Sequence, residues 1–431
     1  MKYFVILPHQ LYHKKFIDKD KQIILWEHPH YFLSFNFNKK KLILHRASMK
    51  YYENYLLESG YQVKYIPFNN TFPKIGEYQV FDPIDKIKLP GKYEMIENPN
   101  FLLTKEQYET YRNQVTDKFF FKTFYEWGKK QINVIPNIKS KDKDNRKRIP
   151  PGTKIPPLPS NKSDKDFIDE ASKYVEKHFP NNYGNTDNFI FPISHKVAKT
   201  WLKNFIEKKF KDFGPYEDFM DKENNYLFHS VLSSSINIGL INPDDIIKEI
   251  SKYQKQIPIN SYEGYVRQLF WREYQRFVYI YNDLSQLNYF GHKNKLTKAW
   301  YNGTTGIEPI DINIKLAFET GYLHHIERLM VMGNFMSLNG IDPKEGHKWF
   351  MEFAIDSYLW VMHQNVYDMV FFVTGGKTMR RPYMSSSNYI LTMSNYGRGD
   401  WVSKWNQLYD EFLRNNKKKL WKFRYFFRGL K

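Results

Sequence analysis

The sequence predicts an α/β domain at the N-terminal end, followed by an all-helical domain. Three observations support this division. Short apolar runs alternate with helical spacing over residues 1–137, a charged and then proline-rich stretch covers residues 138–165, and helical periodicity dominates residues 166–431. A chain of 431 residues also exceeds the size of one ordinary hydrophobic core, so length alone favours two domains.

The first part reads as strands separated by helices. Apolar runs at residues 3–7, 23–26 and 61–66 predict strands, and residues 47–59 predict a helix that ends at Gly60. This order predicts a parallel, Rossmann-like sheet with right-handed crossovers. Thr104 and Gln107 have the spacing of a capping box at the start of a further helix. No GxGxxG or GxxxxGK[ST] pattern occurs, so an ordinary dinucleotide or nucleoside triphosphate loop is not expected.

The second part carries few strand signals. Residues 138–165 are expected to form a linker across the surface. Helices are predicted at residues 167–178, 196–210, 244–253, 262–281, 312–332 and 344–362. No run of about 18 uncharged apolar residues is present, so no membrane span is expected. The expectation is a soluble intracellular protein in the cytoplasm or nucleus, with a viral factory or virion as a further setting for such an AT-biased composition.

The charge balance favours a polyanionic partner. Lys and Arg number 65 against 46 Asp and Glu, a formal charge of +19, which suits nucleic acid or an anionic membrane surface. Nucleotide bias toward lysine codons is the alternative source of this charge. Residues 414–431 hold eight Lys or Arg and no acid, which fits a nucleic-acid contact and a solubilising tail equally well. The absence of cysteine excludes disulfides, thiolate zinc sites and cysteine nucleophiles.

The stretch GYLHHIERLMVMGNF places two imidazoles and a guanidinium in an apolar segment. On a helix, His324 and Arg328 share a face, and His325 points about 100° away. A buried arginine needs an anionic partner, and Asp356 on the next predicted helix is the candidate. An ordinary buried ion pair with two satisfied histidines is the structural alternative and carries about equal weight. No metal site is predicted.

Three further segments carry polar or aromatic groups suited to binding. Serines 230, 233, 234 and 235 crowd a predicted helix start, which suits an anion, although serine is also a common helix cap. Gln268 and Trp271 lie on a basic aromatic helix, where Trp271 could stack on a base or fill the core. The loop GGKTMRRPYMSSSNYI brings Lys377, Arg380 and Arg381 together and fits phosphate contact or a plain surface turn.

Taken in order, several segments resemble the photolyase/cryptochrome superfamily. They are DNRKRIP, FGPYEDFM, FHSVLSSSINIGLINP, EGYVRQLFWREY, HHIERLMVMGNFMSLNGIDP and RPYMSSSNYI. The likeness is strongest to the bacterial iron–sulfur (6-4) photolyase branch, the deoxyribodipyrimidine photolyase-related proteins. It implies an α/β antenna-type domain, an all-helical FAD-binding domain, and light-driven electron transfer from reduced FAD to a flipped-out pyrimidine photoproduct.

The resemblance also implies roles for individual residues. His325 matches a proton donor to the photoproduct, and His324 assists or orients it. The implied FAD contacts are Tyr216, Ser230, Leu232 through its backbone, Ser233, Arg328, Asp356 and Met362. The implied electron relay falls on Trp349, Phe350 and Tyr301, of which Trp349 and Tyr301 are the expected carriers. The expected DNA and lesion contacts are Gln268, Trp271, Lys377, Arg380, Arg381, Tyr383 and Tyr389.

The chain departs from the family pattern at several positions. The four cluster cysteines correspond to Pro309, Gly397, Asp400 and Ser403, so no iron–sulfur cluster is expected. Met362 stands where the family places a hydrogen-bonding partner for flavin N5, and Phe350 is a poor hole carrier. His9 replaces an early family aspartate. This replacement weakens the case for a second, antenna chromophore of the lumazine or folate type.

The leading hypothesis is therefore a (6-4) photolyase, a lyase that acts on double-stranded DNA carrying UV photoproducts. A cryptochrome-like flavin photoreceptor or DNA-binding protein without repair is the second reading, and a cyclobutane-dimer photolyase is the third. A nucleic-acid-binding protein without flavin is the fourth. A monomer is expected.

Overall fold

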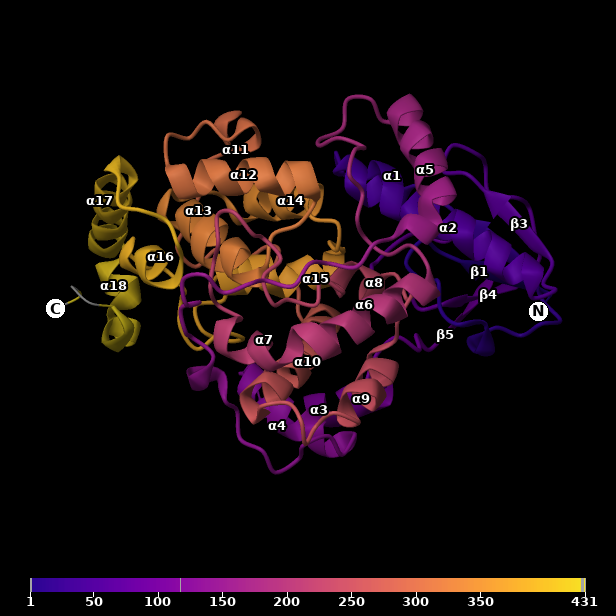
Figure 1. Ribbon diagram of the computed structural model, residues 1–431, viewed down its shortest axis with the longest axis horizontal. Helices are drawn as coiled ribbons and strands as arrows, with labels where there is room; N and C mark the ends of the chain where they lie inside the picture. Colours follow the sequence, from indigo (N-terminus) through magenta and orange to yellow (C-terminus); the bar gives the residue numbers. More distant parts are fainter. Residues whose placement is uncertain (1, 117, 428–429, 431) are drawn as a thin grey trace.

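Five strands form one parallel sheet at one end of the molecule, which the computed structural model describes for residues 2–116, 118–427 and 430 (Figure 1). The strands are β1 (Tyr3–Ile6), β2 (Gln22–Trp26), β3 (Val63–Ile66), β4 (Tyr78–Phe81) and β5 (Tyr93–Ile96). Their order in the sheet is β3-β2-β1-β4-β5, and every pair is parallel. The predicted parallel sheet is confirmed, while β4 was not predicted because its four residues offer almost no periodic signal.

The central strand β1 sets the register of the sheet. Val5 lies opposite Ile24 on β2 and Val80 on β4, and all three side chains are buried. Strands covered on both faces need continuous apolar runs rather than alternation, which is why β1 and β2 read as YFVI and QIILW.

The helix α2 (Lys39–Glu58) begins eight residues before the predicted start at residue 47. Asn38 caps it by accepting a hydrogen bond from the Lys40 N–H at 2.8 Å. The first turn consists of three buried lysines, although a run of lysines usually indicates a solvent-exposed segment. Each lysine is satisfied by a partner from elsewhere in the chain: Lys39 pairs with Glu176, and the Lys41 ammonium donates to Ser357.

The other regular elements of the described chain are helices, besides two isolated β-bridges. The first group comprises α1 (His30–Leu33), α3 (Lys105–Gln114), α4 (Phe121–Gln131), α5 (Lys165–His178), α6 (His195–Lys208), α7 (Phe210–Tyr216), α8 (Ser233–Asn237), α9 (Pro243–Ser251) and α10 (Ile259–Tyr281). The second comprises α11 (Ala299–Asn302), α12 (Glu308–Thr320), α13 (Asn334–Leu338), α14 (Pro343–Phe353), α15 (Leu359–Met362), α16 (Asn388–Met393), α17 (Asp400–Asn415) and α18 (Lys417–Leu420). Two π-helices, η4 (Glu327–Gly333) and η5 (His363–Val370), and the 3-10 helices η1 (Lys14–Phe16), η2 (Asp142–Asp144), η3 (Lys162–Asp164) and η6 (Trp421–Phe426) complete the elements.

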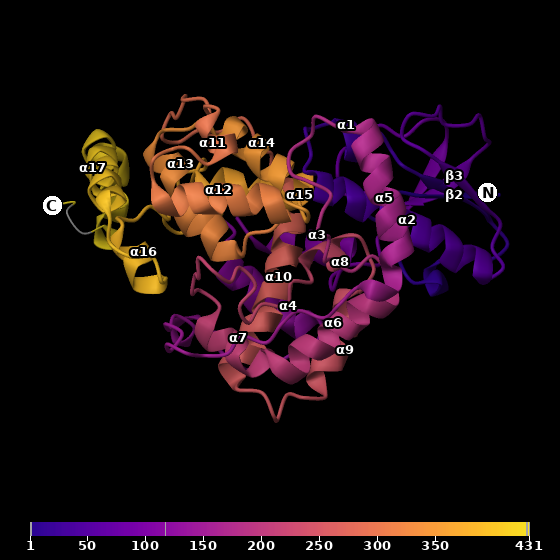
Figure 2. The ribbon, with the colours of Figure 1, turned by 45° about the horizontal axis from the view of Figure 1, so that its top comes forward.

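The long helix α10 runs through the middle of the helical part (Figure 1, Figure 2). It packs against α4, α7 and α15, whereas α5 packs along α2 beside the sheet. Helices α17 and α18 lie at the end of the molecule opposite the sheet in both views. The capping box predicted for Thr104 and Gln107 is present at the start of α3.

Residues 138–165 run between these parts with only two short 3-10 turns. The segment is tied down by specific contacts. The Lys141 N–H donates to Glu263 at 2.9 Å, and the Arg148 guanidinium donates to the carbonyls of Leu391 and Thr392. The segment therefore has a fixed course across the helical part.

Two helices predicted as continuous are broken, one at Gly321 and the other after Phe353. The predicted helix at residues 312–332 ends at Gly321, whose φ of +71° is the left-handed conformation that glycine adopts most readily. The predicted helix at residues 344–362 ends at Phe353, because Ala354 is extended. The two breaks are joined, since the Ile355 N–H donates to the Gly321 carbonyl at 2.9 Å.

Aromatic packing and hydrogen bonds hold the C-terminal region, including the positions Pro309, Gly397, Asp400 and Ser403 at which the resemblance implies cysteines. The Trp405 ring packs against Phe335 with centroids 4.9 Å apart, and the Tyr396 hydroxyl lies 3.0 Å from the Asn313 amide. The Trp401 indole donates to the carbonyl of Gly397. Among the described residues, no helix combines the length and apolarity needed to cross a bilayer.

Candidate active site

A cavity of about 860 Å³ opens in the helical part. This volume lies within the range of roughly 300–1,000 Å³ that is typical of cofactor and ligand sites. Its walls come from α4, α10, η4, η5 and the segments 229–237 and 378–385. Of the residues predicted to act in the site, the cavity is lined by His324, His325, Ser230, Leu232, Ser233, Arg328, Asp356, Met362, Gln268, Trp271, Arg380, Arg381, Tyr383 and Tyr389.

The predicted ion pair of Arg328 and Asp356 is present in the cavity wall. Arg328 Nη1 lies 2.9 Å from Asp356 Oδ1, and Nη2 lies 3.3 Å from Oδ2. The Arg328 Nε–H also donates to the Leu323 carbonyl at 2.7 Å. Burial alone would raise the pKa of Asp356, but the guanidinium and a hydrogen bond with Ser233 outweigh it and hold that pKa below its usual value. The carboxylate therefore stays ionised inside the cavity.

The serine-rich segment enters the cavity through a strained turn. Val231 has a φ of +55°, which is unfavourable for a β-branched residue. Helix α8 then begins at Ser233, as the sequence predicts. The Ser230 hydroxyl accepts a hydrogen bond from Tyr265 at 3.2 Å. Ser230 and Ser233 are half-buried and line the cavity, which places hydroxyls and the start of α8 in its wall, groups of the kind that bind anions.

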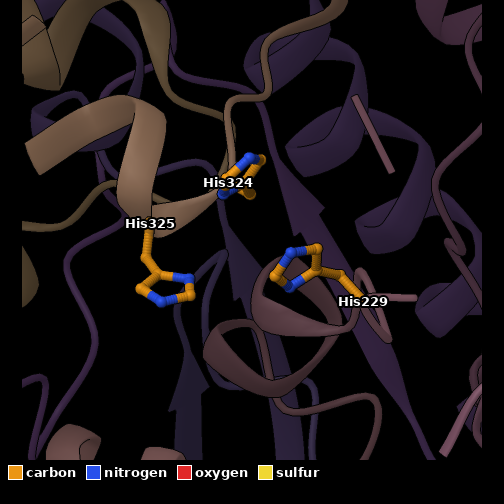
Figure 3. Close-up of side chains that lie close together, drawn as sticks. All are labelled: His229, His324 and His325. Carbon is orange, nitrogen blue, oxygen red and sulfur yellow. The ribbon is translucent and has the colours of Figure 1, made fainter. Parts of the chain in front are cut away.

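The rings of His229, His324 and His325 gather in one space (Figure 3). His229 and His324 are buried and stacked, with centroids 4.8 Å apart and planes 19° from parallel. Burial, the other imidazoles and a nearby cation hold the pKa of both rings well below the usual value. These two rings are therefore neutral at neutral pH, and one nitrogen of each of the three rings lies within 4.8 Å of the others.

His324 caps the helix rather than lying within it. Its Nδ1 accepts a hydrogen bond from the Ile326 N–H at 3.3 Å, and the Glu327 carboxyl accepts from the His324 N–H at 3.1 Å. This reciprocal arrangement has the form of a capping box. Because Nδ1 is an acceptor, the proton of the neutral ring resides on Nε2. Burial raises the pKa of Glu327 to about 8.

His325 is the exposed member of the histidine cluster. Its side chain is 40% exposed, and its Nε2 lies 3.5 Å from Asp218 Oδ1. Glu217, next in sequence, pairs with Arg267 at 2.6 Å, and burial raises its pKa to about 7. Two residues near His325 were not predicted. They are His229, which directly precedes Ser230, and Asp218, which lies in the FGPYEDFM segment.

The two π-helices approach each other closely at Gly333. A Cβ atom at Gly333 would lie 2.6 Å from Val370 Cγ2, so only glycine fits this contact. On η5, Asn365 accepts a hydrogen bond from the Trp271 indole at 2.9 Å and lines the cavity one turn after Met362. Helical spacing from Met362 was the signal that could have identified Asn365.

Cationic and aromatic side chains surround the cavity where it is less buried. Arg380 is exposed, and Arg381, Tyr383, Tyr389 and Trp271 are half-buried. The Arg381 guanidinium lies 5.4 Å from the Tyr383 ring centroid. Two of the predicted cofactor and DNA contacts lie outside the lining of the cavity. Lys377 is exposed and its N–H donates to Thr374, while Tyr216 packs against Phe228 with centroids 5.5 Å apart.

The predicted electron relay is not a continuous set of contacts. Phe350 lines the cavity and touches Trp349, with centroids 5.2 Å apart. Phe318 lies between Trp349 and Tyr301, at 5.8 Å from each ring. The Tyr301 ring then stacks on Tyr183 at 5.0 Å. An aromatic path leads from the cavity wall to Tyr183, and two of its members are phenylalanines.

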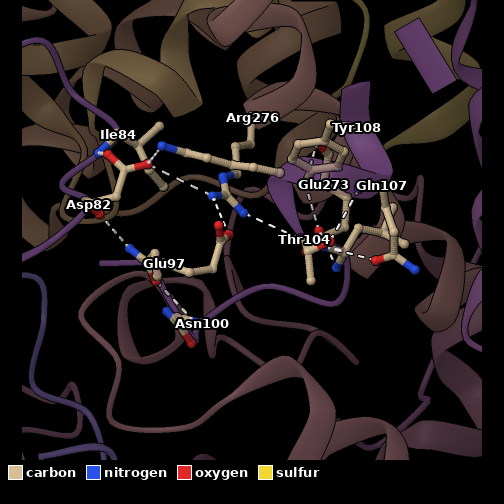
Figure 4. Close-up of polar contacts among 12 residues, drawn as sticks. Asp82, Ile84, Glu97, Asn100, Thr104, Gln107, Tyr108, Glu273 and Arg276 are labelled. Carbon is tan, nitrogen blue, oxygen red and sulfur yellow. Dashed lines mark hydrogen bonds and ion pairs between the residues drawn. The ribbon is translucent and has the colours of Figure 1, made fainter. Parts of the chain in front are cut away.

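A polar network fixes α10 against the segment that joins β5 to α3 (Figure 4). Glu273 accepts hydrogen bonds from the N–H groups of Leu102 and Leu103 and from the Tyr108 hydroxyl. Arg276 pairs with Glu97 at 3.0 Å. These buried contacts position the helix that carries Gln268 and Trp271 into the cavity.

The cavity fits a ligand that combines a flat ring system with an anionic chain. Apolar walls come from Leu232, Phe350 and Met362, and the ionised Arg328–Asp356 pair provides polar groups beside them. Ser230 and Ser233 supply hydroxyls at the start of α8. These features agree with the donors and apolar surface that FAD requires.

Sequence comparisons place both parts of the chain in one family. The family model described as deoxyribodipyrimidine photo-lyase-related protein matches residues 4–80 and 71–191. The model described as FAD binding domain of DNA photolyase matches residues 265–421. A (6-4) photolyase of Agrobacterium fabrum is 36% identical over 294 residues, which are 65% of this chain and 58% of that protein. The uncharacterized protein R853 of Acanthamoeba polyphaga mimivirus is 50% identical over 111 residues, or 25% of this chain and 85% of that protein.

Solved structures share the fold at low sequence identity. A cryptochrome of Synechocystis has a TM-score of 0.61 and 14% identity, with 97% of this chain and 89% of that chain covered. A bacterial class III photolyase from Agrobacterium tumefaciens has a TM-score of 0.56 and 14% identity, with 91% and 80% covered. An archaeal photolyase from Sulfolobus tokodaii, solved with two FAD molecules, has a TM-score of 0.54 at 14% identity and covers 97% and 90%. Because the two photolyase models together match residues 4–191 and 265–421, the chain belongs to the photolyase/cryptochrome superfamily.

Proposed function

We propose that this protein is a light-dependent DNA repair enzyme, a (6-4) photolyase that uses FAD. The observation that carries the proposal is the position of His325. Its half-exposed ring lies in the same cavity as the buried Arg328–Asp356 pair, so one space offers a cofactor site and a proton donor accessible to DNA.

The surroundings of the cavity suit a damaged nucleotide pair flipped out of a duplex. Flipping costs stacking and pairing energy, which new stacking partners must offset. Trp271, Tyr383 and Tyr389 offer aromatic rings, and Gln268 offers a side-chain amide for base edges. Arg380 and Arg381 supply positive charge for the flanking phosphates, with Lys377 exposed nearby in sequence.

Within the site, FAD when bound and reduced supplies the electron that light transfers to the lesion. Arg328 and Asp356 would hold the polar edge of its ring system, and Ser230 and Ser233 its phosphates. The Leu232 backbone and the Met362 side chain would complete its binding surface, and Tyr216 would act from the adjoining segment. The chain keeps water from the buried side through Phe350, Leu232 and Met362, which are all buried.

Proton transfer is assigned to His325. His229 and His324 are held neutral by burial, so neither brings a spare proton to the lesion at neutral pH. Asp218 Oδ1 lies 3.5 Å from His325 Nε2, so a carboxylate stands beside the ring that is proposed to donate the proton. His324 acts as a positioning residue, because it caps the helix that carries His325.

A cryptochrome-like photoreceptor or DNA-binding protein without repair is the second candidate. Met362 and Phe350 favour it, since a thioether cannot accept a good hydrogen bond from flavin N5–H and phenylalanine conducts holes poorly. A light-induced change in the protein without lesion reversal would support this alternative. A cyclobutane-dimer photolyase is separated from the proposal by testing the two lesions individually.

FAD is the proposed chromophore, and a second antenna chromophore of the lumazine or folate type is the weaker part of the proposal. His9, which stands at an early family aspartate, is buried against Tyr31 at 4.5 Å and Tyr358 at 5.4 Å, whereas the archaeal photolyase solved with two FAD molecules supports a second chromophore. Absorbance bands beyond those of flavin in the purified protein would reveal an antenna. The proposed assembly is a monomer on double-stranded DNA, and analytical ultracentrifugation tests this. The sequence identity to a mimivirus protein favours a viral setting.

The direct test is illumination of DNA that carries one defined lesion. We expect flavin absorbance in the purified protein and blue-light restoration of (6-4) DNA but not of cyclobutane dimers. A colourless protein would contradict the FAD assignment. A flavin-loaded, reduced protein that restores neither lesion would leave the photoreceptor alternative.

A further inference from the structure

The C-terminal segment Trp421–Phe426 exposes aromatic rings beside the cavity. Trp421 is 47% exposed, Tyr425 84% and Phe426 52%. Of the large apolar side chains exposed in the described residues, four are aromatic, and three of these lie in this six-residue stretch. Such a concentration of exposed aromatic surface is uncommon on a monomeric protein and marks an interaction site.

The segment is anchored, so the exposed rings have a fixed place. Phe423 is buried against Phe372 with centroids 5.1 Å apart. Lys422 Nζ donates to the Gly375 carbonyl at 2.8 Å, and Lys419 Nζ donates to the Phe290 carbonyl at 3.1 Å. The buried face holds η6 to the helical part while its other face carries the exposed rings.

The exposed rings alternate with positive charge. The Arg424 guanidinium lies 4.9 Å from the Trp421 ring centroid and 4.5 Å from that of Tyr425. Arg381, from the cavity lining, lies 4.9 Å from the Phe426 ring. Lys417 and Lys418 are exposed just before the segment, and no acid occurs in residues 414–431. This mixture of stacking rings and cations is typical of surfaces that bind nucleic acid.

Phe426 connects this surface to the cavity. Phe426 and Phe427 both line the cavity, on the same side as Arg381. When a nucleotide pair flips out of a duplex into the cavity, it leaves a gap in the base stack. That gap would lie next to Phe426 and Tyr425. Apolar side chains at such places can enter the stack and replace the lost base contacts.

We propose that Trp421–Phe426 is a DNA-insertion element, in which Phe426 and Tyr425 stack in the gap left by the flipped nucleotides. Lys417, Lys418 and Arg424 contact phosphates on the flanking strand. The inference rests on the proposed function, because it names how the same cavity receives double-stranded DNA. Charge complementarity and continuity with the cavity favour DNA over a protein partner on this face.

The test measures DNA binding in the dark, which requires no photochemistry. The variants are Phe426→Ala and Tyr425→Ala, with Tyr93→Ala as the matched control, since Tyr93 is 42% exposed on β5 at the other end of the molecule. Each stacked base is worth enough that we expect about 5-fold or weaker binding of a (6-4)-containing duplex for each variant. The same variants should bind the lesion in a single strand with little change, because a single strand leaves no gap to fill.

The outcomes separate this inference from the proposed function. Wild-type protein that prefers damaged duplex, with variants that bind it equally well, would overturn the insertion element and leave the photolyase assignment standing. An equal loss on single-stranded and double-stranded lesions would also overturn it, since it would indicate a general contact. Wild-type protein without preference for damaged duplex would contradict both. Self-association that disappears in the variants, without any change in DNA binding, would assign the face to a second copy instead.

A charge series gives an independent measurement. Lys417→Gln and Lys418→Gln should weaken binding to damaged and undamaged duplex alike and reduce the salt dependence by about one phosphate contact each. An unchanged salt slope in both would contradict the phosphate contacts. All substituted side chains are exposed, and equal melting temperatures should accompany each comparison.

Discussion

The imidazoles of His229 and His324 stack 4.8 Å apart behind the half-exposed ring of His325. His324 Nδ1 also accepts a hydrogen bond from the Ile326 N–H and so caps the start of the helix that carries His325. We expect His324→Ala to lower the free energy of unfolding by about 1 kcal/mol, the usual value of an N-cap. His324→Asn should restore most of it, because asparagine is a strong cap. Urea denaturation of the three proteins checks this, and equal losses in both variants would contradict the capping role.

The pH dependence of stability tests the neighbouring carboxyl. Burial raises the pKa of Glu327 to about 8, so the folded protein keeps a proton that the unfolded chain loses near its ordinary value of about 4.3. This contribution is complete at low pH and is lost as the pH rises toward 8, at about 1.4 kcal/mol for each pKa unit at most. Glu327→Gln keeps an acceptor for the His324 N–H and does not titrate.

We therefore expect the stability of Glu327→Gln relative to wild type to grow between pH 5 and pH 8. Comparing the two proteins at each pH cancels the titration of the histidines, which has the opposite sign. Unfolding free energies from urea titrations at four pH values measure the difference. A difference that stays constant over this range would contradict a buried, protonated Glu327.

Breaking the Arg328–Asp356 pair should lower both the stability of the protein and its flavin content. Asp356→Asn leaves the guanidinium in the cavity wall without its anion, which should cost about 3 kcal/mol. The bound flavin per protein should fall with it. Asp410→Asn, an exposed position on α17, is the control and should change neither quantity. Full flavin content in Asp356→Asn would remove this pair from the cofactor site.

Photoreduction tests the aromatic path from the cavity. Phe350 lies between the cavity and Trp349, and phenylalanine is hard to oxidise. Phe350→Trp should therefore speed the blue-light reduction of the flavin several-fold, and Trp349→Phe should slow it. Flavin absorbance under illumination with an external reductant follows both rates. Equal rates in all three proteins would show that electrons reach the cavity by another path.

The fold was largely predictable because its signals are local. The strands β1 and β2 are continuous apolar runs, and the capping box at Thr104 and Gln107 needs only two residues at a fixed spacing. The start of α2 was not predictable, because its three lysines are buried only through partners 137 or more residues away in sequence. The breaks after Thr320 and Phe353 were hidden for a similar reason, since the contact from Ile355 to Gly321 joins two distant segments.

The site was predictable where a residue's chemistry demanded a partner. Arg328 in an apolar segment required an anion, and Asp356 fulfils this requirement. His229 and Asp218 could not be assigned, because neither belongs to a repeating pattern and both meet His325 only through the folded chain. The proximity of Phe426 to the cavity likewise depends on the course of the last helices.

Restoration of (6-4) DNA by the wild type and by His325→Ala, both loaded with reduced flavin, is the most direct test of the central claim. His325 is half-exposed and lies beside Asp218, whereas Arg328 and Asp356, which are proposed to hold the cofactor, pair with each other. The variant should therefore bind flavin normally. We predict that blue light restores the bases with the wild type and that His325→Ala abolishes this repair. Equal repair by both proteins, or none by the wild type, would contradict the account.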